Sequence, residues 1–227
     1  MFKYISILFT AGFVLTSCNN HEKKQVEFAK PKTTIVLLYD ISTSNDEFAL
    51  LNESHLAKIY NKVANNGGGK FYAYLIKTDS KKQEVFEFEI PAIDTLELKG
   101  NMYQIKKLKN KNMQKREQLE SHLAEFTTQA KQKLLLPKTE SFTDLENALH
   151  LAQTTINQPN VSSTNINILI ISDGINDLPP VDGPDKMESV DFGTANVILV
   201  RPVNRNYIIG NPTVTNSIND CIVNLKF

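Results

Sequence analysis

The chain has 227 residues, of which 41% are hydrophobic and 22% are charged, which is typical of a globular protein and unlike a disordered or fibrous one. Its 25 basic and 25 acidic residues give a formal net charge of zero, which excludes the global positive field expected of a protein that holds nucleic acid. A chain of this size can bury enough surface to fold as a single domain without disulfide bonds.

The first residues have the pattern of a secretory signal. Lys3 precedes an apolar run over 4–14, which is too short to cross about 30 Å of hydrocarbon as a helix at about 1.5 Å per residue. The run leads into Leu-Thr-Ser-Cys at 15–18, which resembles a bacterial lipobox. The resemblance implies that residues 1–17 are removed and that Cys18 is lipidated. The chain would then be a lipoprotein of the bacterial cell envelope, held by its anchor on the periplasmic or surface side of a membrane; a plain secretory signal is the alternative.

The residues that follow the lipobox predict a flexible link between anchor and domain. Residues 18–33 are mostly polar and are expected to lack packed structure. The chain has two cysteines, so lipidation of Cys18 leaves Cys221 without a partner for an intramolecular disulfide. Cys221 lies in an apolar stretch and is predicted to be a small buried side chain.

The first half of the domain predicts a strand, a helix and a hairpin. Residues 34–39 are a continuous apolar, β-branched run, which indicates a strand covered on both faces, as in a parallel sheet. Apolar residues at helical spacing predict a helix over 47–63. Strands are expected over 71–76 and 84–90, antiparallel because the turn between them is short, and the alternation in the second is typical of an edge strand.

The segment 99–138 differs from the rest in composition. Its basic residues outnumber its acidic ones by seven, and a long helix is predicted over 112–136, ended by Pro137. We expect a basic helical insertion, whose charges lie in solvent or, as an alternative, contact anionic lipid near the anchor.

The second half predicts a further helix and more strands. A helix is expected over 143–156, a central strand over the purely apolar run 166–171, and another strand over 197–200. Residues 221–225 are predicted to be an edge strand, with a last helix within 201–227 left open.

These elements predict one α/β domain over 34–227. Strands that alternate with helices give a doubly wound, mostly parallel sheet with one antiparallel edge strand and helices on both faces. In such sheets ligands bind beyond the carboxyl ends of the strands, at the topological switch point. This rule selects the loops that follow Tyr39 and Ile171.

Both loops carry oxygen ligands. Asp40, Ser42 and Ser44 stand at alternate positions after the first strand, so that they can converge on one cation, and Asp173 follows the central strand. Thr143 opens the helix of 143–156, where it is also predicted to be the N-cap. Carboxylates and hydroxyls suit Mg²⁺, Mn²⁺ or Ca²⁺, whereas the scattered histidines give no zinc pattern.

This constellation resembles the metal-ion-dependent adhesion site of von Willebrand factor type A (VWA) domains, and the resemblance covers residues 33–205. It implies that Ser42 and Ser44 bind the cation through their hydroxyls. It implies further that Thr143 binds directly or through water, and that Asp40 and Asp173 act largely through water. Mg²⁺, with Mn²⁺ or Ca²⁺ as alternatives, would then accept a carboxylate from a partner protein of the envelope or surface. Two departures from the family are the long basic segment and the Pro- and Gly-containing stretch in place of the last helix.

The resulting hypothesis is a membrane-anchored, non-catalytic lipoprotein that binds a partner protein through a divalent metal. One alternative is an Mg²⁺-dependent phosphoryl-transfer enzyme that uses Asp40 and Asp173, but Ser42 stands where such chemistry needs a second acid. No histidine is expected near either loop, because His55 and His150 are predicted to lie well along their helices. The other alternative is a structural envelope subunit with a vestigial metal site.

Overall fold

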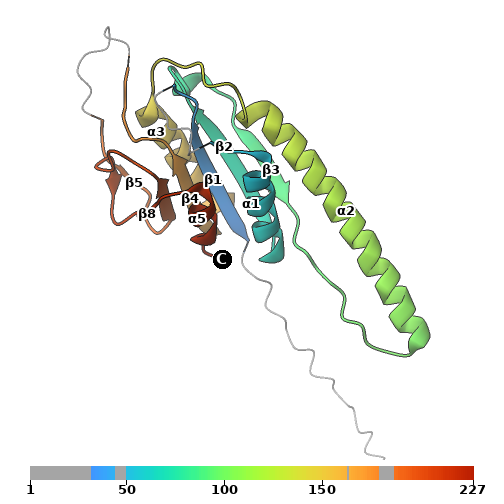
Figure 1. Ribbon diagram of the computed structural model, residues 1–227. Helices are drawn as coiled ribbons and strands as arrows, with labels where there is room; N and C mark the ends of the chain where they lie inside the picture. Colours follow the sequence, from blue (N-terminus) through green and yellow to red (C-terminus); the bar gives the residue numbers. More distant parts are fainter. Residues whose placement is uncertain (1–31, 44–49, 163, 179–186) are drawn as a thin grey trace, which may run out of the picture.

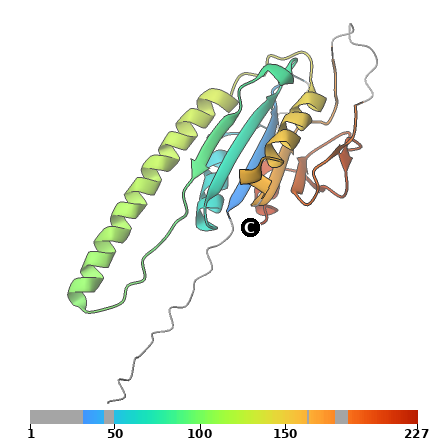
Figure 2. The same cartoon turned by 180° about the vertical axis from the view of Figure 1, so that it is seen from behind.

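The computed structural model describes residues 32–43, 50–162, 164–178 and 187–227, and it is built on a six-stranded sheet (Figures 1 and 2). The strand order is β3-β2-β1-β4-β6-β8, and every neighbouring pair is parallel except β2 with β3. The predicted doubly wound α/β fold with an antiparallel edge strand is therefore confirmed. The strands are β1 (Thr33–Asp40), β2 (Gly69–Ile76), β3 (Phe86–Ile90), β4 (Asn165–Ile171), β6 (Asn196–Val200) and β8 (Thr213–Thr215).

The chain enters the sheet at the start of β1. Every residue of β1 is buried, as a strand covered on both faces requires. Thr33 is already part of the strand, because its N–H donates to Gly68 O at 3.0 Å, so the expectation that packed structure begins after residue 33 is wrong by one residue. The signal segment, Cys18 and the rest of the tether lie outside the described residues.

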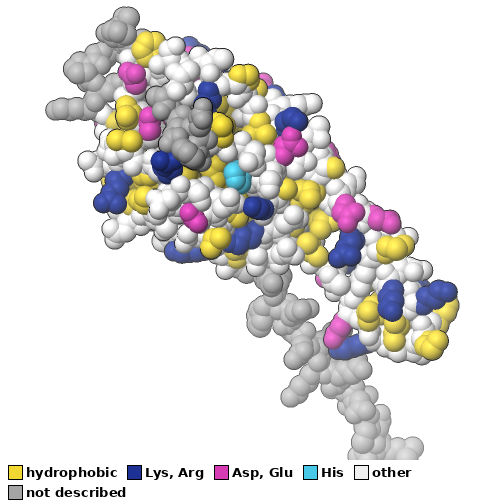
Figure 3. Space-filling view, viewed as in Figure 1, with side chains coloured by type: hydrophobic (Ala, Val, Ile, Leu, Met, Phe, Trp, Pro, Cys, Tyr) yellow, Lys and Arg dark blue, Asp and Glu magenta, His cyan; other side chains and the backbone are white. Residues whose placement is uncertain are grey.

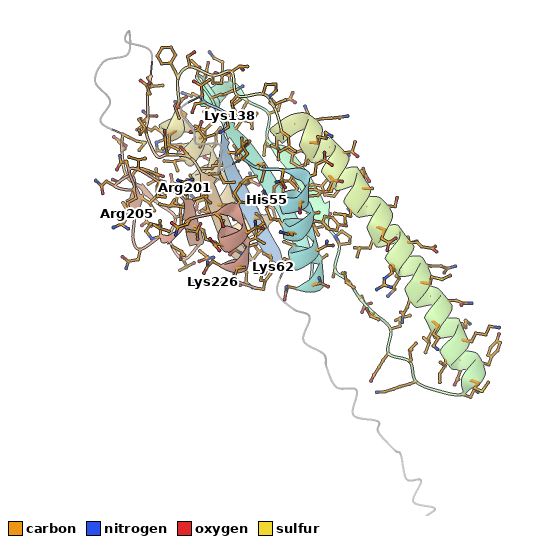
Figure 4. The ribbon with its side chains drawn as sticks, viewed as in Figure 1. His55, Lys62, Lys138, Arg201, Arg205 and Lys226 are labelled. Atoms are coloured by element: carbon orange, nitrogen blue, oxygen red, sulfur yellow. The ribbon has the colours of Figure 1, made fainter. Side chains whose placement is uncertain are left out.

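One face of the sheet is covered by α1 (Glu53–Asn65), α5 (Ile218–Val223) and part of α2 (Met102–Leu134). The predicted edge strand over 221–225 is wrong, since α5 occupies most of it. Buried residues at helical spacing form its inner side: Ile218, Cys221 and Ile222. Cys221 is fully buried, as predicted. Lys62 of α1 donates to Ile222 O and Val223 O at 2.6 and 2.9 Å and so caps the end of α5 (Figure 4).

The opposite face is covered by α3 (Leu145–Ile156) and α4 (Pro159–Ser162). Beside them lies a small parallel pair, β5 (Val190–Asp191) and β7 (Ile208–Ile209), which contributes apolar residues to the same core. A short 3₁₀ helix, η2 (Ser80–Lys82), links β2 to β3. Helices therefore lie on both faces of the sheet, and the ends of the strands are not covered by them.

The helix predicted from 143 begins two residues later, at Leu145, and two other helix starts differ by more. Residues 50–52 are irregular and α1 begins at Glu53, because Asn52 accepts a hydrogen bond from His55 N at 3.0 Å and caps the helix there. In contrast, α2 begins ten residues before the predicted 112, where Asn101 and Gln104 form a capping box. Capping positions are set by a few local hydrogen bonds, which apolar periodicity does not report.

The long helix α2 packs on the sheet through its second half, from Leu119 onward. Its buried residues are Phe126, Ala130 and Leu134, and the earlier turns run out past the sheet (Figure 1). No helix in the described ranges is both long and apolar enough to cross a membrane.

Candidate metal centre

The candidate site lies where β1 and β4 end side by side. The two strands are parallel neighbours with Tyr39 opposite Ile171, so the residues that follow, Asp40 and Ser172, meet at the same edge. The chain continues from β1 to β2 on one side, whereas β4 lies on the other side of β1. This is the topological switch point at which ligands of doubly wound sheets bind.

Asp40 is the most enclosed acidic residue of the site. Its side chain has no exposed surface, and Oδ1 accepts from Ser42 N at 2.8 Å. Oδ2 accepts from Ser172 Oγ at 2.8 Å, and the Ser42 hydroxyl also bonds to the carboxyl group. Burial raises the pKa of Asp40, as does the nearby charge of Asp173, against the lowering effect of these hydrogen bonds. A cation beside this carboxylate would offset the cost of burying its charge.

Asp173 follows one residue after Ser172 and is half-buried. Its Oδ1 accepts from Ile175 N at 3.0 Å, and its carbonyl accepts from Val203 N at 2.6 Å, which draws the loop after β6 against the site. Gly174 must be glycine, because its φ is +79° and a Cβ there would lie 2.1 Å from Asn204 O. The Asp-Gly pair is therefore required by the backbone as well as by its chemistry.

Thr143 is buried and is held in the site region by backbone pairing with the loop after β4. Thr143 N donates to Asp177 O at 2.7 Å, and Asp177 N donates to Thr143 O at 2.9 Å. The prediction that Thr143 is the N-cap of α3 is wrong. The N-cap is Asp144, whose Oδ1 accepts a hydrogen bond from Asn147 N at 3.2 Å. The Thr143 side chain is thus not engaged in capping the helix.

The loop after β1 joins the same cluster. Ser42 pairs with Glu140, and Thr43 N donates to Glu140 O at 3.0 Å, so the segment that leads to Thr143 lies against the loop of Asp40 and Ser42. The structure thus brings Asp40, Ser42, Thr143 and Asp173 to one end of the sheet. Ser44 lies outside the described residues.

Two further residues belong to this region and were not identified from the sequence. Ser172 holds Asp40, and Tyr207, which is 2% exposed, has a hydroxyl without a hydrogen-bond partner in the described part of the chain. Burial raises the pKa of Tyr207, and so do the charges of Asp173 and Asp40, which places the phenol near both carboxylates. The Ser-Asp-Gly sequence could have indicated Ser172, whereas no sequence signal indicates Tyr207.

The donor set fits a hard divalent cation. Its members are carboxylates and hydroxyls, and the buried Tyr207 hydroxyl oxygen could accept a hydrogen bond from a water bound to such a cation. Within the described ranges, no group of three or more His, Cys, Asp or Glu residues could hold a metal, so a site here depends on hydroxyl ligands. Asp40 and Asp173, Ser42 and Thr143 are the side chains available for it.

The histidine prediction needs one correction. Because α1 begins at Glu53, His55 lies in the first turn of that helix and not well along it (Figure 4). Its pKa is lowered by burial and by the charge of Lys58. His150 lies in the middle of α3, as expected.

Comparison with known proteins gives distant structural likenesses. No family model matches the sequence, and no curated protein matches it. Proximal thread matrix protein 1 (PTMP1) from the mussel byssus is 13% identical over 87% of this chain and 47% of its own, with a TM-score of 0.38. Manganese-loaded Plasmodium vivax TRAP protein is 15% identical over 87% of this chain and 73% of its own, with a TM-score of 0.40. The chain spans about half the length of PTMP1, and no assignment of function rests on either likeness.

Proposed function

We propose that this chain is a VWA-type binding module, in which a divalent cation at the ends of β1 and β4 accepts a carboxylate from a partner protein. The observation that carries the proposal is the buried Asp40 carboxylate. Ser42 and Ser172 hold it, and the charge of Asp173 lies near it. Two carboxylates brought together in a buried place favour a cation between or beside them.

The carboxylates and the hydroxyls of the site have different roles in holding the cation. Asp40 and Asp173 supply negative charge, and the Ser42 and Thr143 hydroxyls supply neutral oxygen ligands, with Ser44 as a fifth candidate. When bound, the cation supplies a position that an outside carboxylate can fill. Mg²⁺ suits this role, because it usually keeps several waters and takes few protein carboxylates; Mn²⁺ and Ca²⁺ are the alternatives.

The burial of Asp40 speaks against the phosphoryl-transfer alternative. A nucleophilic carboxylate must reach a substrate atom, whereas both oxygens of Asp40 accept hydrogen bonds and the residue has no exposed surface. Its burial therefore suits a carboxylate that supports ligands better than one that attacks a substrate. The hydrogen bonds that hold Asp40 in place likewise argue against a vestigial metal site.

The proposed anchor suits this arrangement. The described chain begins at Lys32, at the amino end of β1, whereas Asp40 lies at the carboxyl end. Eight residues of strand separate the two ends by roughly 25 Å. A chain attached to a membrane through Cys18 would hold the site on its far side, turned toward a partner.

Cation binding is tested by thermal unfolding with and without millimolar Mg²⁺ or Mn²⁺. Binding to the folded state alone should stabilise it by about 2.7 kcal/mol at a hundredfold excess over Kd. Asp40→Asn and Asp173→Asn should abolish the increase, whereas Asp94→Asn should keep it, as a matched change at the exposed partner of Lys115 in the segment after β3. An equal increase in all three variants would place the cation elsewhere. Capture of a partner from solubilised envelope should likewise depend on the metal and on Asp173.

The anchor is tested by counting reactive thiols in the purified protein. Burial raises the pKa of Cys221 to about 12, so this thiol should resist alkylation at pH 8 until the protein unfolds. A lipidated chain should therefore show no reactive thiol when folded and one when unfolded. A thiol that reacts in the folded protein and maps to Cys18 would contradict the anchor.

A further inference from the structure

We propose that residues 98–116, which are the projecting end of α2 and the four residues before it, dock on an anionic phospholipid surface and so fix the domain's orientation on the membrane. We call this segment the basic arm. The proposal deepens the proposed function, because it rests on a membrane anchor at Cys18, although the arm itself is built entirely from described residues.

The arm projects beyond the sheet. Phe126 of α2 packs on Phe71 and Phe88 at ring distances of 5.3 and 5.1 Å, and His122, one turn earlier, packs on Phe88 at 4.9 Å. Ile90 at the end of β3 pairs with Gly69, which in turn pairs with Thr33, so β3 ends beside the amino end of β1. The turns of α2 that precede Leu119 lie beyond this end of the sheet (Figure 1). From Leu119 back to Met102, the helix extends by roughly 25 Å.

The arm is held firmly although it is not packed on the core. The irregular segment after β3 runs beside it, and Asn112 exchanges two hydrogen bonds with the backbone of Leu96, at 2.9 and 2.8 Å. Lys115 donates to the carbonyl and the carboxylate of Asp94 at 2.9 and 3.1 Å. These contacts fix the direction of the arm relative to the sheet.

Its charge is of one sign. No acidic residue occurs between Leu98 and Arg116, and the arm has seven cationic side chains. Two of them are paired, Lys99 with Glu97 and Lys115 with Asp94. Four exposed lysines form no ion pair with any described residue: Lys106, Lys107, Lys109 and Lys111. Such a cluster near a membrane is attracted to anionic headgroups.

Exposed apolar side chains stand at the tip among these lysines. Met102 is 88% exposed and Tyr103 is 77% exposed, at the first turn of the helix. Figure 3 shows basic and hydrophobic side chains side by side at this end of the molecule. Lysines with an adjacent tyrosine and methionine match a lipid surface, which offers negative charge outside and hydrocarbon beneath it.

The position of the arm is the deciding observation. The described chain begins at the same end of the molecule toward which the arm projects, as both ribbon views show (Figures 1 and 2). An anchor attached before Lys32 would bring the arm to the membrane, and contact by the arm would leave the candidate metal centre at the far end.

The absence of tryptophan from the chain allows a direct test. The full chain with Tyr103→Trp is reconstituted with vesicles of phosphatidylcholine alone or with one-third phosphatidylglycerol. In the anionic vesicles its emission should shift to the blue and be quenched by lipids brominated on their acyl chains. The matched control is Val203→Trp, which replaces an 80% exposed side chain at the metal-centre end and should show neither effect.

A charge variant completes the test. Replacing Lys106, Lys107, Lys109 and Lys111 by glutamine should remove the blue shift and lower vesicle affinity of the arm by on the order of a hundredfold or more. Flotation with neutral vesicles reports the anchor separately from the arm. A chain that floats while the Tyr103→Trp variant emits as in water would overturn the arm proposal and leave the anchor. A shift given by heparin but not by vesicles would also overturn it, in favour of a soluble polyanion.

Discussion

Polar groups are buried at one end of this molecule and exposed to solvent at the other. At the carboxyl ends of β1 and β4, a carboxylate and several hydroxyls are buried, and short hydrogen bonds hold them. At the other end, the basic arm carries exposed lysines, and four of them make no ion pair with the described residues. The geometry of the first end is therefore set by hydrogen bonds within the fold, whereas most of the charge at the second end faces solvent.

This difference separates two kinds of recognition. A buried set of oxygens can select one small, hard cation, because desolvated ligands must be satisfied and their positions are fixed. An exposed row of like charges selects only the sign and spread of a surface, and its attraction weakens with salt. Substitutions should therefore cost stability at the first end and leave it unchanged at the second.

The largest effect is expected where the second half of α2 packs on the core. Phe126→Ala should lower the free energy of unfolding by about 3–5 kcal/mol, because a fully buried ring that packs on Phe71 and Phe88 is lost. Met113→Ala, at a 58% exposed site on the same helix, is the matched control and should change stability by less than about 0.5 kcal/mol. Denaturant unfolding measures both. Equal losses would show that α2 packs along its whole length.

An intermediate effect is expected at the metal centre. Ser172→Ala removes the hydroxyl that donates to Asp40 and accepts from Gly174 N, and should cost about 2 kcal/mol in the absence of metal. Because that hydrogen bond lowers the pKa of Asp40, the variant should lose more stability as the pH rises and Asp40 ionises, and less in acid. Urea unfolding between pH 4 and 8 tests the sign. The exposed Ser189→Ala is the control; a loss that grew in acid would contradict the assignment.

The smallest effect is expected on the arm. Four lysines of the arm, 106, 107, 109 and 111, form no ion pair with a described residue, and replacing them by glutamine should change the free energy of unfolding by less than about 0.5 kcal/mol. Lys62→Gln is the contrasting lysine, because Lys62 caps α5 through Ile222 O and Val223 O, and its loss should cost about 1–2 kcal/mol. Chemical denaturation of both variants compares them. A large loss from the arm variant would mean that its lysines support the fold.

The candidate site was predicted by spacing and by a rule of topology. Asp40 and Asp173 could be placed together because each follows an apolar strand, and parallel strands end at one edge of a sheet. Ser172 and Tyr207 could not be found in this way. Tyr207 comes from a stretch with no helix or strand periodicity, and its position depends on the loop after β6 folding back against Asp173.

The sequence by itself determined five of the six strands of the main sheet, including the antiparallel edge strand, and the acidic ends of the two central strands, because buried strands and their loops differ sharply in polarity. It did not predict the sixth strand, β8. It did not determine the last element, where Cys221 belongs to a helix, since a short apolar run suits a strand or a buried helix equally well. Nor did it determine that Asp144 and not Thr143 caps α3, or that α2 begins at Met102 and projects past the sheet. Those features depend on contacts between residues far apart in the chain, or on single hydrogen bonds, and only the tertiary structure decides which of them form.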